Sequence, residues 1–274
     1  SNDHKEYNLA FVILFGSFAR GDWVLDSYVE DGIVYEYSSD YDILVVLDSN
    51  TKNNKDTYYQ LKDHINKQLS IEGFDKKTLD HNHCVHIIIE PLFHINEMLD
   101  QNHYFYHDIY TQGVLLHQNN KYHLHPPKKP DETKRLEIAK EDYKYWIRNG
   151  EDFLQGSKNF LKNNKNNPSA FLLHQATESF FHCVLLVFTG YKHKIHDIDN
   201  LKKRCCSFAY QFLTIFPDAT IEQQKCYDLL RQSYIDARYN KNFQINQQQL
   251  QYLITRVEKL QEVTKEVCLK ALSS

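Results

Sequence analysis

The first third of the chain carries short apolar runs separated by polar turns. Apolar residues fill positions 11–15 and 43–47, and a run rich in β-branched residues occupies 85–89. Runs of this length that are bounded by turn residues predict buried strands. Residues 22–38 alternate apolar and polar side chains around Asp31-Gly32. This alternation predicts a β-hairpin insertion that lengthens the sheet or borders the site.

Helical spacing follows the strand-like runs. Residues 56–69 place apolar side chains at helical intervals, and residues 93–112 do so in two short stretches. Gly113 should cap the second of these stretches, and residues 114–116 predict a last strand. The pattern therefore predicts an α+β domain over residues 1–122.

A proline-rich segment separates this domain from a purely helical half. Residues 123–131 contain Pro126, Pro127 and Pro130, which exclude a helix interior, and Asp131-Glu132 is typical of a new helix start. We interpret 123–131 as a linker and 132–274 as an all-α domain. Its expected helices cover 132–161 (as one helix or two), 168–190, 201–216, 221–237 and 247–272. The stretch 168–190 is apolar around most of its circumference, which predicts the centre of a helical bundle.

The first apolar run ends in residues that suit phosphate binding. Gly16-Ser17 follows the strand directly and precedes one permitted helical turn. Backbone N–H groups at a helix start have no intrahelical partner, glycine allows close approach, and Ser17 adds a hydroxyl. Asp40 and Asp42 stand one residue apart at the start of the next strand, so both side chains face the same way. Two adjacent carboxylates repel unless a cation lies between them, which predicts a Mg²⁺ site.

The phrases GSFARG at 16–21 and SDYDILV at 39–45 resemble the nucleotidyltransferase superfamily of DNA polymerase beta. The likeness is greatest to the minimal nucleotidyltransferases and the kanamycin nucleotidyltransferases. It rests on Gly16, Ser17, Ala19, Arg20, Gly21, Ser39, Asp40, Asp42 and Val45. The spacing between Arg20 and Asp40 is longer than usual in the family. The resemblance implies a mixed β-sheet with flanking helices that transfers a nucleoside monophosphate from NTP·Mg²⁺, with ATP expected, to an acceptor hydroxyl.

The same resemblance implies a role for each matched residue. Gly16 and Ser17 would hold the β- and γ-phosphates, and Asp40 and Asp42 would ligate magnesium. Glu90 is the acid available on the neighbouring strand, so it would hold a second metal ion or take the acceptor proton.

Two further assignments in this half have alternatives. Glu90 could instead end its strand in solvent. Arg20 would pair with a carboxylate or a phosphate, or pack. The histidines at 81, 83 and 86 are interpreted as surface or substrate-lining residues, because their spacing is a weak match to a zinc site.

The helical half resembles the HEPN domain, an up-and-down bundle often paired with minimal nucleotidyltransferases. The likeness rests on FLLHQATESFFHCVLLVFTGY at 171–191, HKIHDIDNL at 193–201 and YIDARY at 234–239. Active HEPN ribonucleases carry an arginine followed four to six residues later by a histidine. Arg238 matches the arginine, but no histidine follows it. This difference argues against ribonuclease activity by that route and favours a structural or phosphate-contacting Arg238.

His174 and Glu178 stand four residues apart on one helical face. We interpret them as a buried polar pair, because a bundle core needs its polar groups paired. The lining of a substrate groove is the alternative.

The net charge of −4 conceals a difference between the halves. Residues 1–125 carry 9 Lys+Arg against 19 Asp+Glu, a balance of −10, and residues 126–274 carry 23 against 17, a balance of +6. Opposite signs indicate either that the halves dock on each other or that the second meets an acidic partner such as RNA. Docking is the preferred interpretation, so RNA is not favoured as a partner.

Composition also bounds the location. No apolar run approaches a membrane span, and the six cysteines lack metal-site spacing, so we expect reduced thiols, no membrane partner and a cytoplasmic protein. No signal peptide precedes Tyr7, and Ser1-Asn2 is interpreted as a tag remnant.

Three functional hypotheses follow. The first is a nucleotidyltransferase whose helical domain binds the nucleotide or the acceptor, which would be an aminoglycoside, a protein tyrosine or an RNA end. The second is a HEPN ribonuclease of a toxin–antitoxin module, regulated by its transferase domain. The third is a non-catalytic nucleotide-binding protein, whose hallmark would be an unfilled third acidic position. A homodimer is consistent with all three, because relatives often build their site between subunits.

Overall fold

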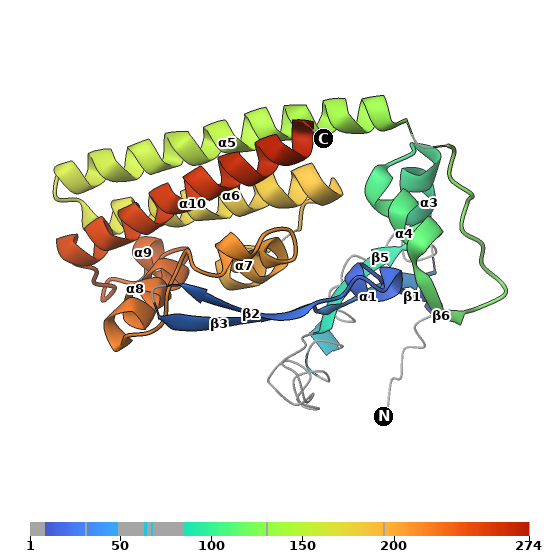
Figure 1. Ribbon diagram of the computed structural model, residues 1–274, viewed down its shortest axis with the longest axis horizontal. Coiled ribbons are helices and arrows are strands. Elements are labelled where there is room, and N and C mark those ends of the chain that lie inside the picture. The colour runs from blue at the N-terminus through green and yellow to red at the C-terminus, as the bar shows by residue number, and fades with distance from the viewer. Residues whose placement is uncertain are drawn as a thin grey trace. The chain divides into compact units, whose positions relative to one another are not determined.

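The computed structural model describes residues 9–30, 32–48, 85–129, 131–193 and 195–273, with the single positions 63, 64 and 67. Its contacts divide the chain into two units (Figure 1). The sheet unit comprises Ser1–Asp26 and Glu36–Pro130, and the helical unit comprises Ser27–Tyr35 and Asp131–Ser274. The predicted fold class, a mixed sheet with helices followed by a helical bundle, is confirmed.

Four strands form the mixed sheet, in the order β5-β4-β1-β6. Strand β1 is antiparallel to β4 and to β6, whereas β4 is parallel to β5. The strand bounds are Leu9–Phe15 for β1, Tyr41–Leu47 for β4, Val85–Pro91 for β5 and Val114–Gln118 for β6. The apolar runs and the predicted last strand therefore form this sheet.

Two short helices, α3 (Leu92–Asp100) and α4 (Tyr104–Gln112), follow β5 in the chain. Phe15 at the end of β1 meets Phe105 of α4 edge to face, with ring centroids 5.7 Å apart. Gly113 caps α4 as predicted, and its N–H donates to the Ile109 carbonyl. Because a Cβ at Gly113 would lie 2.6 Å from Cγ2 of Ile13, glycine allows α4 to pack closely against β1.

The opposite face of the sheet has its own apolar cluster. Its buried members are Val45, Leu47 and Ile89. Partly buried Leu9, Ile43 and Ile87 pack against them. The odd-numbered residues of β4 and β5 thus share one face, and the even-numbered residues share the other.

The insertion between α1 (Ser17–Arg20) and β4 forms the predicted hairpin. Strands β2 (Leu25–Glu30) and β3 (Ile33–Ser38) make a two-stranded sheet of their own, so they do not lengthen the main sheet. At the base of the hairpin the Val24 N–H donates to Ser39 Oγ at 3.0 Å, and the Ser39 N–H donates to the Val24 carbonyl at 2.9 Å. The helix predicted over 56–69 falls outside the described residues except at 63, 64 and 67, which are helical.

Three long helices lie along one another in the helical unit (Figure 1). They are α5 (Glu132–Lys162), α6 (Asn166–Thr189) and α10 (Gln247–Ser273). Asp131 caps α5 as predicted, since its carboxylate accepts the Lys134 N–H at 3.1 Å. Residues 132–162 form one continuous helix rather than two.

Helix α6 is the core of this bundle. Most of its residues are buried, in agreement with its apolar circumference. Among the described residues it is also the one helix long and apolar enough to cross a membrane. In the most apolar 18-residue stretch of α6, 72% is buried inside the structure, so the apolar character of α6 is explained by its place at the centre of the bundle.

The prediction of one helix over residues 201–216 was wrong about the length of that helix. The chain forms α7 (Ile198–Cys206) and then a short 3₁₀ turn, η2 (Tyr210–Phe212). Between them Phe208 stacks on Phe188 of α6, with centroids 4.5 Å apart. Phe208 therefore packs against α6 at a position where the predicted helix would have continued.

The helix predicted over 221–237 is also interrupted. Three residues, 233–235, separate helix α8 (Ile221–Gln232) from the short helix α9 (Asp236–Tyr239). Ser233 Oγ donates to the Leu230 carbonyl at 2.7 Å and to a carbonyl of α6 at 3.1 Å. A serine that bonds backbone carbonyls in this way competes with helical hydrogen bonding.

Candidate functional site

In the sheet unit, Gly16 lies directly against Asp42. Phe15 pairs with Asp42 across β1 and β4, and Gly16 follows with φ 77° and ψ −156°. A Cβ at Gly16 would lie 2.7 Å from Asp42 Oδ2. The structure therefore brings together the glycine-serine turn and the second aspartate, as a shared nucleotide site requires.

A histidine is the third polar group beside the aspartates. His86 pairs in register with Asp42, so both side chains lie on one face of the sheet. His86 Nε2 lies 2.8 Å from Asp40 Oδ2, and both side chains are largely buried. His86 is buried and so is not a surface residue, whereas its interpretation as a substrate-lining residue stays a prediction. Both Asp42 and His86 occupy the second position of their strands, but the sequence does not reveal the register that aligns them.

Glu90 lies further along the same strand. It pairs with Val46, four residues from Asp42, which corresponds to about 13 Å along a strand. The structure therefore does not bring Glu90 to the two aspartates. The alternative that Glu90 ends the strand in solvent is also wrong, because the residue is buried.

Arg20 pairs with a carboxylate at the surface. Its Nε lies 3.0 Å from Asp22 Oδ2, and both side chains are exposed. Such exposed pairs add little stability. Ser17 begins the four-residue α1, and its carbonyl accepts the Gly21 N–H at 2.9 Å.

The aspartates form a small donor set for a cation. Among the described residues, no group of three or more His, Cys, Asp or Glu side chains is arranged to hold a metal ion. Mg²⁺ commonly takes one or two protein carboxylates and completes its octahedron with water and substrate phosphates. Asp40 and Asp42 fit that limited role, and His86 already occupies one oxygen of Asp40.

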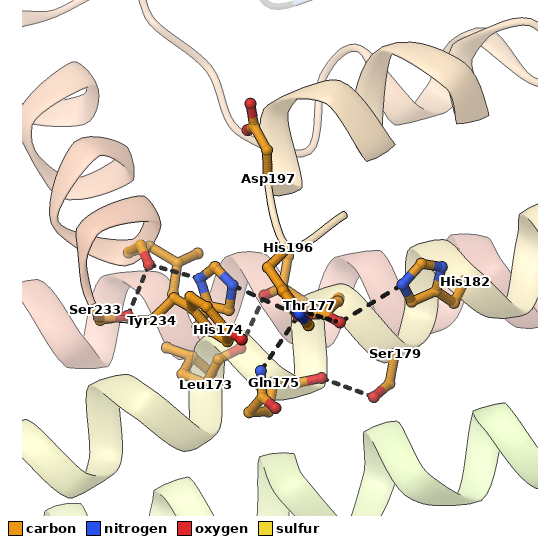
Figure 2. Close-up of polar contacts among 12 residues, drawn as sticks. Leu173, His174, Gln175, Thr177, Ser179, His182, His196, Asp197, Ser233 and Tyr234 are labelled. Atoms are coloured by element: carbon orange, nitrogen blue, oxygen red, sulfur yellow. Dashed lines mark hydrogen bonds and ion pairs between the residues drawn. The ribbon is translucent and has the colours of Figure 1, made fainter. Parts of the chain in front are cut away.

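The helical unit contains a second polar cluster, around Glu178 of α6. His196 Nδ1 lies 3.1 and 3.2 Å from its two carboxylate oxygens. His182 Nε2 and His174 Nε2 approach at 3.5 and 3.8 Å, and Gln175 Nε2 donates at 3.3 Å. Figure 2 shows His174, His182 and His196 converging from α6 and from the segment before α7. The expected pair of His174 and Glu178 is thus one contact in a cluster of five residues.

Burial and neighbouring charges set the protonation states of Glu178 and His174. Burial opposes ionisation of Glu178, but the contacts from His182 and His196 outweigh it, so the pKa of Glu178 lies below its ordinary value. Burial lowers the pKa of His174, whose Nδ1 lies 3.0 Å from the Leu230 carbonyl. At neutral pH, Glu178 is therefore a carboxylate and His174 is neutral.

His196 differs from the other two histidines because it reaches solvent. Its side chain is 55% exposed, whereas those of His174 and His182 are 1% exposed. Asp197, the next residue, caps α7 by accepting two of its first N–H groups. The His196 ring stacks on Tyr234 with centroids 4.4 Å apart and planes 17° apart. The cap and the stack together fix the position of an exposed imidazole.

Arg238 lies beside the same tyrosine. Its Nε and Nη2 both donate to the Tyr234 carbonyl, Nε at 2.8 Å. Its guanidinium lies 4.6 Å from the ring centre of Phe171, 4.8 Å from that of Tyr234 and 4.9 Å from that of Tyr239. Arg238 is exposed, and Tyr239 is 74% exposed. The guanidinium is therefore held among aromatic rings at the surface.

A groove lies elsewhere on the helical unit, between the start of α6, α8 and the segment before α10. Its volume is about 540 Å³. It is lined by Asn166, Asn167, Lys225, Leu229, Phe243, Gln244, Ile245, Asn246 and Gln249. Asn166 Nδ2 donates to the Ile245 carbonyl at 2.9 Å, so part of the lining serves to hold the chain together.

Comparison with known families identifies the helical half. Residues 143–267 match the model of the HEPN domain, a range that contains Glu178, His196 and Arg238. The HEPN resemblance is thereby confirmed, and no family is assigned to the N-terminal sheet region. No curated protein matches the chain. The nucleotidyltransferase assignment of Gly16, Ser17, Asp40 and Asp42 stays a prediction.

Proposed function

We propose, from the HEPN domain that residues 143–267 contain, that this protein binds RNA at the surface around Arg238 and His196. One observation carries the proposal: an exposed guanidinium lies among three aromatic rings, one of which also stacks on an exposed imidazole. The HEPN match supports this assignment, because Arg238 lies within the matched residues and occupies the position of the arginine in the ribonuclease motif that the sequence resembles.

The chemistry of these side chains suits a single-stranded nucleic acid. A guanidinium donates charge-assisted hydrogen bonds to phosphate oxygens, and its planar shape stacks on rings. Exposed aromatic rings such as Tyr239 offer a surface on which bases stack. Residues 126–274 carry 23 Lys+Arg against 17 Asp+Glu, so the charge of this half favours a polyanion.

Binding of a labelled single-stranded RNA, followed by fluorescence anisotropy in EDTA, tests the proposal. Arg238→Ala removes the phosphate contact and should weaken binding about tenfold, a typical loss for one such contact. Arg148→Ala is the matched control, because Arg148 is an exposed arginine of α5 whose side chain is 82% accessible.

Two results would contradict the assignment. One is equal affinity of the wild type and Arg238→Ala. The other is a loss on Lys225→Ala with none on Arg238→Ala, which would move the site to the groove between α6 and α8.

A second function is favoured by the contact between Gly16 and Asp42: binding of NTP·Mg²⁺ by the sheet unit. Asp40 and Asp42 would ligate magnesium, and Gly16-Ser17 would receive the phosphates. The bound ion would neutralise charge on the triphosphate. Glu90 lies on β5 four residues beyond His86, the residue that pairs with Asp42, or about 13 Å along the strand. The residue of β5 beside Asp42 is therefore a histidine and not the third acid of a transferase. This arrangement favours nucleotide binding over nucleotidyl transfer.

Calorimetry with ATP and Mg²⁺ tests this second function. The wild type should bind, and Asp42→Asn should not, because it removes a magnesium ligand next to the phosphate turn. Glu90→Gln should bind as well as the wild type. Incubation with labelled NTPs would detect transfer of a nucleoside monophosphate to an acceptor hydroxyl. If the wild type transfers the label and Glu90→Gln does not, the sheet unit is a transferase that uses Glu90, and the assignment of nucleotide binding alone is wrong.

A further inference from the structure

We infer that Lys192 and the aromatic residues beside it form a second nucleotide-binding position, three turns of α6 away from Arg238, on one single strand of RNA. This second position depends on the proposed RNA binding at Arg238 and extends it. Lys192 would contact a phosphate, and Tyr145 would offer a ring to a base.

Lys192 is held over an aromatic ring in the same manner as Arg238. Its Nζ lies 4.3 Å from the ring centre of Trp146 of α5. Lys192 is exposed, and no carboxylate of the residues that the structure describes forms an ion pair with it. An ammonium group that is fixed on a ring and not neutralised by an acid is available to a phosphate oxygen.

An exposed tyrosine accompanies each of the two cations. Tyr145 is 61% exposed, and its ring meets that of Trp146 edge to face, with centroids 5.4 Å apart. Tyr239 is 74% exposed, and the Arg238 guanidinium lies 4.9 Å from its ring centre. Nucleic acid bases stack on exposed rings of this kind in proteins that bind single strands. Each position thus combines one phosphate contact with one stacking surface.

Contacts with α6 place the two cations along one face of this helix. At one end the Arg238 guanidinium lies 4.6 Å from the ring centre of Phe171. At the other end the Trp146 ring, over which Lys192 lies, is 5.5 Å from the ring of His182. Phe171 and His182 are eleven residues apart in α6, which is close to three turns, so both lie on the same face. The helical rise separates them by about 16 Å along the axis.

An exposed imidazole lies between these two ends. His196 contacts Glu178, which precedes His182 by one turn of α6, and its ring stacks on Tyr234. Figure 2 shows His196 with Tyr234 on one side and His182 on the other. Lys192 precedes His196 by four residues, so their Cα atoms are at most about 14 Å apart. The chain after α6 therefore brings Lys192 and His196 to successive levels of the same helix face.

The separation of the two positions sets the length of RNA that fills them. Adjacent phosphates of one strand are much closer together than about 16 Å, so Arg238 and Lys192 meet phosphates of different nucleotides. In a strand with stacked bases the nucleotides repeat about every 3.4 Å, so about five of them span the distance. A duplex buries the faces of its bases, whereas a single strand presents them to Tyr145 and Tyr239.

A comparison of RNA lengths tests the second position. Fluorescence anisotropy in EDTA follows binding of a labelled uridine trinucleotide and a labelled uridine dodecamer to the full chain. Lys192→Ala should weaken binding of the dodecamer about tenfold and leave that of the trinucleotide unchanged, because the trinucleotide cannot reach both cations. Lys192→Arg keeps the charge and should keep the affinity.

The salt dependence gives an independent readout. For the dodecamer, the slope of log affinity against log salt concentration should be smaller by about 0.7 in Lys192→Ala, the contribution of one phosphate contact on a single strand. Lys202→Ala is the matched control. Lys202 also lies over a ring, that of Tyr227 at 4.9 Å, but it pairs with the Asp199 carboxylate at 4.0 Å. Circular dichroism shows whether each variant is folded.

The outcomes separate the second position from the RNA binding on which it depends. If Arg238→Ala weakens binding of the dodecamer and Lys192→Ala does not, the second position is wrong and the RNA-binding proposal stands. If neither substitution has an effect, both are wrong. An equal loss for the two RNA lengths in Lys192→Ala, or an equal loss in Lys202→Ala, would also overturn the second position.

Discussion

At Gly16 the backbone has a φ of 77°, and the space that a side chain would fill is taken by the Asp42 carboxylate. The sequence predicted that Gly16 lets a ligand approach the backbone, which stays a prediction, and it did not indicate the contact with Asp42. It did not reveal that His86, rather than Glu90, stands level with Asp42, because strand register depends on pairing between residues far apart in the chain. Likewise, the exposed partner of Glu178 lies in the segment before α7, which helical spacing within α6 could not indicate.

The crowding at Gly16 leads to a prediction. Gly16→Ala should reduce the free energy of unfolding and weaken ATP·Mg²⁺ binding, because the new methyl group displaces Asp42 and the backbone is strained by about 1–3 kcal/mol. Gly21→Ala is the control, since its φ is 79° but nothing lies within 4 Å of the added Cβ. Urea unfolding and calorimetry measure the two effects. Nucleotide affinity that falls equally in both variants would contradict a specific contact with Asp42.

The buried His174 should make the helical unit sensitive to pH. Burial lowers its pKa below the ordinary 6.5, so the unfolded chain binds a proton that the folded chain resists. The stability is complete above pH 6.5 and falls as the pH drops below it toward the folded pKa. Glu178, whose pKa lies below its ordinary value of 4.5, adds no dependence between pH 5 and 7.

Urea unfolding at pH 7 and pH 5 checks this sensitivity. The wild type should lose stability at pH 5, and His174→Asn, which retains a donor toward the Leu230 carbonyl, should lose less. Equal losses in the two proteins would show that His174 is not the group responsible.

At the scale of elements, the apolar pattern predicted well where an element is long and periodic. Helix α6 was expected at the bundle centre because it is apolar around its circumference, and the structure places it there. The pattern failed where a single side chain interrupts a helix, as Ser233 does after α8 and Phe208 does after α7. Those interruptions arise from contacts with other helices, which a local reading of the sequence does not contain.

Close packing of α5 on α6 gives a prediction at this scale. A Cβ at Gly150 would lie 2.6 Å from Cδ1 of Phe180, whose ring is fully buried. Gly150→Ala should therefore destabilise the protein by about 1–3 kcal/mol through overpacking. Gly156→Ala is the comparison, because its Cβ would meet only Cδ1 of Leu172, at 2.8 Å, at the end of a flexible side chain. Thermal unfolding should rank Gly150→Ala as the less stable, and the reverse order would contradict this account of the interface.

At the scale of the whole molecule, the two halves of the chain carry opposite net charges. The net charge is −10 over residues 1–125 and +6 over residues 126–274. The sequence predicted both the change from an α+β half to an all-α half and the HEPN likeness of the second half. The preferred interpretation of the charge, docking of the halves, stays a prediction. The guanidinium and imidazole beside Tyr234 support the alternative, the acidic ligand that we propose for the helical unit.

Photo-crosslinking tests the central claim most directly. The full chain is irradiated with RNA that contains 4-thiouridine, and the crosslinked peptides are identified by mass spectrometry. The account predicts crosslinks within residues 234–239 and at His196, and their loss in Arg238→Ala. Crosslinks confined to the groove residues 243–249, or to the sheet unit, would contradict it.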